Sequence, residues 1–70
     1  MAKHNFQPGQ RIQANMKYFT GKNEWHECTF TEIIHRGDIV KYCVKFDEKI
    51  GLIVAGVGYV LEAKNVKTLN

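Results

Sequence analysis

Hydrophobic and polar residues alternate with a period of two along most of the chain, and no segment keeps the period of a helix. Residues 11–18 alternate almost without interruption, which predicts a strand. Its buried side chains are expected to be Ile12, Ala14, Met16 and Tyr18. A turn at Pro8-Gly9 starts this strand, and residues 19–23, which contain glycine and asparagine, are expected to form a loop.

Two further segments predict a β-hairpin. Residues 25–35 form the second strand, with Cys28 and Phe30 on one face. The Arg-Gly-Asp sequence at residues 36–38 is the strongest turn signal in the chain. Residues 40–46 form the third strand, whose inward side chains are Val40, Tyr42, Val44 and Phe46.

The register of this hairpin predicts the state of the two cysteines. A hairpin centred on the glycine of the turn pairs Cys28 with Phe46, and Thr31 with Cys43. The cysteines then lie on opposite faces of the sheet and form no disulfide. The alternation slips near residues 32–34, which indicates a bulge or the end of the second strand.

The last third of the chain completes an all-β fold. Residues 52–61 supply a fourth strand, interrupted by Gly56 and Gly58 at a bulge, a bend or a close backbone approach. Residues 62–65 suit a single 3₁₀ turn, and residues 66–69 a short closing strand.

Five short strands joined by tight turns favour a five-stranded SH3/Tudor-like barrel. The barrel domain is expected to span residues 9–70, after an N-terminal arm at residues 1–8. Closure would remove the exposed edges that a flat sheet would have. The apolar stretch 50–61 is longer than one barrel strand needs, so a dimer interface there stays open.

Composition limits the function classes. With 70 residues, 44% of them hydrophobic, the chain is one domain near the lower size limit for independent folding. Its hydrophobic residues are needed for the core, which leaves little room for an enclosed substrate cavity. We therefore expect a non-enzymatic protein without a cofactor. The net charge of +3 permits contact with nucleic acid or with an acidic partner.

Location and metal chemistry follow from absent patterns. The first residues lack a secretory signal pattern, and the longest apolar run, residues 50–61, is shorter than the roughly 20 residues of a membrane-spanning helix. We expect a cytoplasmic or nuclear protein with free thiols. His4, His26 and His35 do not have the spacing of a metal-ligand set, so no metal site is expected.

Several short motifs resemble the Tudor family of small barrels, in particular spindlin-type Tudor domains. The motifs are Phe6-x-Pro8-Gly9-Gln10-x-Ile12-x-Ala14, Glu24-Trp25-x-x-Cys28-x-Phe30-x-x-Ile33, Val44-x-Phe46-Asp47, Leu61 and Asn65-Val66-x-x-Leu69. The resemblance covers nearly the whole chain. Each motif is short, so the resemblance bears more on the fold than on the function.

The resemblance implies an aromatic cage for a methylated lysine or arginine, held by cation–π attraction. Carried over by position, the cage would consist of Met16, Trp25 (or His26 if the register slips by one), Phe46 and a residue near Ile53. Only Trp25 and Phe46 are aromatic, so the chain departs from the family pattern where the ligand would bind.

The residues also favour two binding surfaces of their own. Tyr18, Trp25 and Phe46 are expected to form an aromatic rim at one end of the barrel, which Phe19 could join. The outward side chains of the first and third strands predict a basic face that could contact phosphates, made of Arg11, Lys17, Lys41 and Lys45.

Three functions remain open: a nucleic-acid- or transcription-associated adaptor, a methylated-lysine peptide reader, and a small inhibitor or assembly protein that docks on a larger protein.

Overall fold

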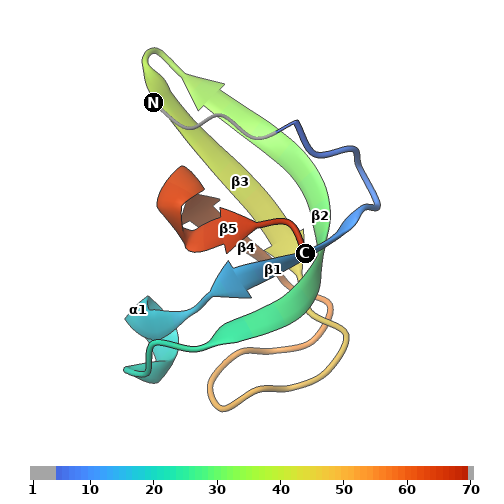
Figure 1. The fold of residues 1–70 in the computed structure, drawn as a ribbon, viewed down its shortest axis with the longest axis vertical. Coiled ribbons are helices and arrows are strands. Elements are labelled where there is room, and N and C mark those ends of the chain that lie inside the picture. Colours follow the sequence, from blue (N-terminus) through green and yellow to red (C-terminus); the bar gives the residue numbers. More distant parts are fainter. Residues whose placement is uncertain (1–4, 70) are drawn as a thin grey trace.

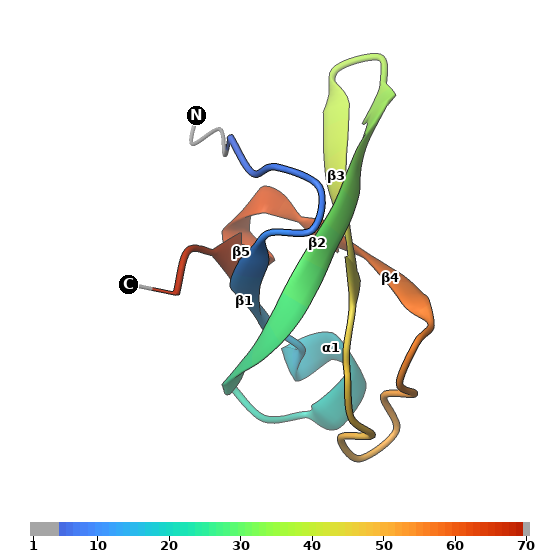
Figure 2. The same ribbon diagram turned by 90° about the vertical axis from the view of Figure 1, so that its right-hand side faces the viewer.

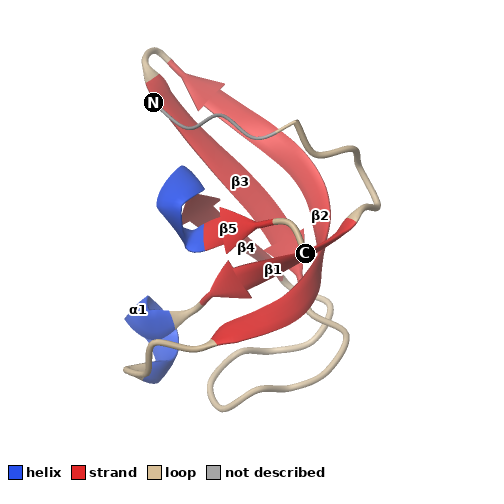
Figure 3. Cartoon of the chain, viewed as in Figure 1, coloured by secondary structure: helices blue, strands red, loops and turns tan. Residues whose placement is uncertain are grey.

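The computed structural model describes residues 5–69. The first four residues of the expected arm, His4 among them, and Asn70 lie outside the described part. One antiparallel sheet contains the strands β1 (Arg11–Asn15), β2 (Trp25–Arg36), β3 (Ile39–Lys45), β4 (Gly58–Glu62) and β5 (Val66–Lys67) (Figure 1). Helical structure in residues 5–69 is limited to the short helix α1 (Lys17–Thr20) and the 3₁₀ turn η1 (Ala63–Asn65) (Figure 3). The predicted all-β class and the 3₁₀ turn before the last strand are confirmed.

The connection between the last two strands requires the sheet to curl. The strand order is β4-β3-β2-β1-β5, so β4 and β5 occupy opposite edges although only η1 separates them in the chain. In a flat five-stranded sheet the two edges would lie about 19 Å apart. The link from Glu62 to Val66 spans at most about 14 Å. The sheet therefore bends round on itself (Figure 2), but no described strand pairing joins β4 to β5, so it is not closed.

The inside of the curled sheet holds the core. Its fully or almost fully buried side chains are Ile12, Ala14, Met16, Cys28, Phe30, Tyr42, Val44, Phe46, Ile53, Leu61 and Val66. The predicted inward faces of the first three strands are confirmed, with Val40 packed at the margin of the core. Phe6, from the expected arm, packs on this core at a ring-centroid distance of 5.5 Å from Phe30.

Tyr18 is the exception, because the first strand ends earlier than the alternation predicts. Asn15 Oδ1 accepts a hydrogen bond from the Lys17 backbone N–H at 3.0 Å, and the carbonyl of Met16 accepts one from the N–H of Phe19 at 2.8 Å. These bonds turn the chain into α1, where a loop or strand was expected. Tyr18 is 94% exposed, so its predicted burial is wrong.

The β2–β3 hairpin has the predicted turn and a bulge. On the side of the bulge that is farther from the turn, Phe30 faces Val44, in the predicted register. The register then shifts between Phe30 and Glu32, so that Glu32 faces Cys43. The predicted pairing of Thr31 with Cys43 is therefore wrong by one residue, because the bulge inserts a residue in β2. Both cysteines are free, as predicted.

The predicted fourth strand is too long. Only residues 58–62 form β4, and residues 46–57 form a loop. Two backbone hydrogen bonds join Ile50 and Ile53, and the Gly56 N–H donates to the carbonyl of Phe46 at 2.9 Å. Gly56 has a φ of +77°, which accounts for a glycine where the chain bends back. The closing strand β5 is also shorter than the expected 66–69. No helix among the described residues has the length and apolar character to cross a membrane.

Candidate functional site

Exposed aromatic side chains gather on α1. The rings of Tyr18 and Phe19 meet edge to face at 5.9 Å between centroids, and Phe19 meets Tyr59 of β4 at 5.2 Å. Tyr59 in turn contacts the buried ring of Phe46 at 6.1 Å. Two members of the expected rim, Tyr18 and Phe46, are thus connected through Phe19 and Tyr59. Sequence reasoning missed Tyr59, although it lies in the apolar stretch noted there.

Trp25 lies on the other face of the sheet, so the structure does not bring the three expected rim residues together. It pairs with Asn15 across β1 and β2 and alternates with the buried Cys28, which places its ring outside the core. Lys67 Nζ lies over the indole at 4.1 Å from the centroid. This cation–π contact occupies one face of the ring with a lysine of the chain itself.

Two hollows flank Phe19. One, of about 360 Å³, lies between α1 and β4; its lining residues are Tyr18, Phe19, Lys41, Val60, Leu61, Glu62 and Asn65. The other, of about 290 Å³, lies between α1 and the 46–57 loop; its lining residues are Phe19, Thr20, Lys22, Glu24, Ile50, Gly51 and Leu52. We call them the β4 hollow and the loop hollow.

The loop hollow lies within a solvent-exposed apolar region. Leu52 on one side of it is 81% exposed, and Phe19, on the other, adjoins the exposed Tyr18. We call Tyr18, Phe19 and Leu52 the apolar end. α1 and the loop lie at the same end of the molecule, away from the β2–β3 turn (Figures 1 and 2). Large apolar side chains grouped in this way are characteristic of interaction surfaces.

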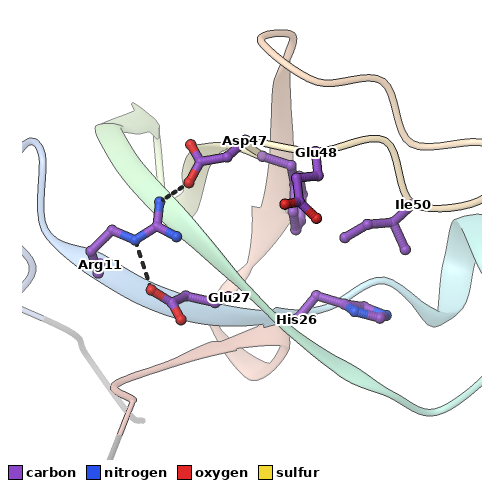
Figure 4. A pocket seen from close by; sticks show the side chains of 7 residues that line it. Arg11, His26, Glu27, Asp47, Glu48 and Ile50 are labelled. Atoms are coloured by element: carbon purple, nitrogen blue, oxygen red, sulfur yellow. Dashed lines mark hydrogen bonds and ion pairs between the residues drawn. The ribbon is translucent and has the colours of Figure 1, made fainter.

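A third hollow, of about 300 Å³, is charged (Figure 4). Arg11 lies at its side and bridges two acids: its Nε donates to Glu27 Oε2 at 2.8 Å, and a terminal nitrogen lies 2.7 Å from Asp47 Oδ2. The hydrogen bond to Glu27, followed by the contacts with Asp47, raises the pKa of the Arg11 guanidinium above its usual value. The charge of Arg11 is therefore balanced by two carboxylates before any ligand arrives.

The remaining lining of this charged hollow is more acidic than basic. Glu48 adds a third carboxylate, and its side chain extends toward the space above β2 (Figure 4). His26 Nε2 is buried without a hydrogen-bond partner among the described residues, and Glu24 Oε1 lies 3.7 Å from it. This lining favours a cation over a phosphate. No group of acids, histidines and cysteines within residues 5–69 has the arrangement of a metal site.

The four residues of the expected basic face are not contiguous. Arg11 of β1 and Lys45 of β3 lie on the two sides of Thr29 in β2, and the exposed acids Glu27 and Glu32 lie farther along β2. Lys17 is on α1, and Lys41 pairs across the strands with Glu62. The face therefore carries mixed charge.

The positions that the resemblance implies for a cage lie mostly in the core. Met16, Phe46 and Ile53 are 2% exposed or less, so their side chains offer no open surface to a methylated cation. Of the implied cage positions, only Trp25 and His26 are partly exposed.

Burial also raises the pKa of the Cys28 thiol to about 12, which makes it a poor nucleophile.

Comparison of the chain with protein-family models, with curated proteins and with solved structures gave no match. The Tudor-like resemblance therefore stays a prediction from the sequence.

Proposed function

We propose that this chain is a non-enzymatic SH3/Tudor-like barrel that docks on another protein through its apolar end. The barrel assignment is supported by the curl of the five-stranded sheet and by the short η1 link between its two edges. The docking function is supported above all by one observation: two large apolar side chains adjoin Phe19 and project into solvent, Tyr18 through ring contact and Leu52 across the loop hollow.

The physical reason is the hydrophobic effect. Removing a leucine or tyrosine side chain from water stabilises a complex by about 1.5–3 kcal/mol each. Tyrosine also brings a hydroxyl that can form a hydrogen bond at an interface, and it is enriched among the residues that dominate binding. A chain with a small core gains nothing in its own stability from leaving these side chains in water, so a role in binding accounts for them.

The two other functions have less support. Nucleic-acid binding needs free positive charge, whereas Arg11 is paired with Glu27 and Asp47. A methylated-lysine reader needs open aromatic faces, whereas Phe46 is buried and Lys67 covers part of Trp25. Both remain predictions and enter the test as competing outcomes.

The partner can be captured at Tyr18, because that side chain is exposed and does not contribute to the core. A photo-crosslinking amino acid at position 18, introduced in the cells that produce the chain, labels the partner for mass spectrometry. Affinity for the purified partner is then measured by titration calorimetry for Leu52→Ser and Tyr18→Ser. Ile39→Ser is the matched control, because Ile39 is also apolar and exposed but lies next to the β2–β3 turn.

We expect Leu52→Ser and Tyr18→Ser each to weaken binding about tenfold or more, as truncation of a buried interface residue does. Ile39→Ser should bind like the unmodified chain. Unchanged affinity in both apolar-end variants would contradict the proposal. So would a crosslinked nucleic acid whose affinity falls steeply with salt, or binding that depends on Trp25 and on lysine methylation of the partner.

A further inference from the structure

The free edge of β4 is open to pairing with another strand. β4 pairs with β3 on one side and with no described strand on the other. The β4 hollow lies between this edge and Tyr18 and Phe19 of α1, so α1 flanks the edge without pairing with it. Backbone N–H and C=O groups along such an edge lack strand partners.

Apart from its short length and the charge of Glu62, β4 lacks the features that usually protect an edge strand. The five residues Gly58–Glu62 contain no lysine and no proline. The other edge strand, β5, has only two residues and carries Lys67, so it offers little to pair with. Val60 points outward from β4 and is 50% exposed.

We propose that the partner of this edge is a second copy of the same chain, paired antiparallel through a two-fold axis at Val60. Such an axis sets Val60 against Val60 of the second copy, and Tyr59 against its Leu61. On the outer face Val60 adjoins Cys43, its cross-strand neighbour. The centre of the interface is therefore an apolar strip made mainly of Val60 from both copies, since the neighbouring Cys43 is only 9% exposed.

The charges beside this strip are complementary under the same two-fold axis. Glu62 faces Gly58 of the second copy, and Gly58 is the cross-strand neighbour of Lys45 in its own chain. Glu62 and the second copy's Lys45 are then about 10 Å apart between Cα atoms. Their long side chains can meet above Gly58, which has no side chain to separate them. Glu62 faces Lys41 across β3 and β4 in its own chain, but neither Glu62 nor Lys45 takes part in an ion pair within residues 5–69. The contact occurs twice, once on each side of the axis.

Of the apolar end, Tyr18 and Phe19 also line the β4 hollow, so only Leu52 separates docking from self-pairing. The loop hollow and Leu52 lie on the other side of Phe19 from the β4 hollow. Leu52→Ser therefore reports on the docking partner, and Val60 variants report on the self-pairing. Either proposal can fail while the other holds.

Sedimentation equilibrium between about 10 µM and about 1 mM measures self-association of the full chain. The mass should rise from 8.1 kDa toward that of a dimer. Val60→Lys should weaken the dimer by about tenfold or more, because two like charges then meet at the axis. Its fold is checked by circular dichroism, which should not change, since Val60 is outside the core. A mass that stays monomeric in the unmodified chain, or a dimer that survives in Val60→Lys, overturns the proposal.

A disulfide test fixes the register. Val60→Cys, in a Cys43→Ala background that prevents bonding within the chain, should form a covalent dimer under mild oxidation, since residues facing across a two-fold axis have Cβ atoms about 5 Å apart. Glu62→Cys in the same background is the matched control. It lies on the same strand and face but is displaced from the axis, so it should crosslink at least about tenfold more slowly. Equal crosslinking of the two variants overturns the register.

Discussion

Ile53 fixes the 46–57 loop to the core and thereby leaves Leu52 in solvent. Ile53 is 0% exposed, whereas its neighbour Leu52 is 81% exposed. Replacing a buried isoleucine by alanine costs about 2–5 kcal/mol, from lost burial and from the cavity left behind. Leu52→Ala should change the free energy of unfolding by less than about 0.5 kcal/mol, because almost nothing packs on Leu52. The two adjacent positions form a matched pair.

Urea unfolding, followed by circular dichroism, measures both variants. A domain of 70 residues is expected to have a free energy of unfolding of about 4–10 kcal/mol. Ile53→Ala can remove much of this, so Ile53→Val, with an expected cost of about 0.5–1.5 kcal/mol, serves as the milder change. The melting temperature of Ile53→Val should fall by roughly 2–12 °C.

Amide exchange gives a second readout on the same loop. The Gly56 N–H donates to the carbonyl of Phe46, and Ile53 lies in the loop that this bond closes. The protection of the Gly56 N–H against amide exchange should fall in Ile53→Val and stay unchanged in Leu52→Ala. If Leu52→Ala costs as much stability as Ile53→Ala, the alternation of residues 52–54 is inverted. The apolar end would then lose Leu52.

Two further predictions concern stability. Burial raises the pKa of the Cys28 thiol to about 12 from the value of 9.0 that it regains on unfolding. The buried thiol therefore keeps its proton where the unfolded one loses it, and stability falls as the pH rises above 9.0. Urea titrations from about pH 8 to about pH 10 should show a steeper loss, by up to about 1.4 kcal/mol per pH unit, than in Cys28→Ala. Equal slopes would contradict this. Gly56→Ala should cost about 1–2 kcal/mol in the same assay because φ is +77°, whereas Gly58→Ala, without a positive φ or a near neighbour, should be almost neutral. Similar costs at both positions would refute the role given to the backbone at Gly56.

The sheet and its core could be predicted because burial of one face imposes a period of two. Ile12, Ala14 and Met16 follow it, and so does the run from Tyr42 to Phe46. The same rule failed at Tyr18, because hydrophobic periodicity does not record where a strand ends. There a local hydrogen bond from the Lys17 N–H to the Asn15 side chain turns the chain into α1.

The charged surface could not be predicted by reading single strands. Arg11 alternates outward on β1 as expected, but Glu27 comes from β2 and Asp47 from the loop that follows β3. Their convergence depends on strand pairing between residues far apart in the sequence. Counting lysines and arginines along two strands therefore overestimated the positive charge that a ligand would meet.

The segments that interrupt the alternation also carry the binding residues. α1 interrupts it after β1, and residues 46–57 interrupt it after β3. Neither segment is needed to complete the strand pairing of the sheet, so both can expose apolar side chains without loss of the core. The curl of the sheet places them at one end, where Phe19 of α1 and Leu52 of the loop line the same hollow. Exposure of these residues thus follows from the same curl that buries the core, since the chain has no further element to cover that end within residues 5–69.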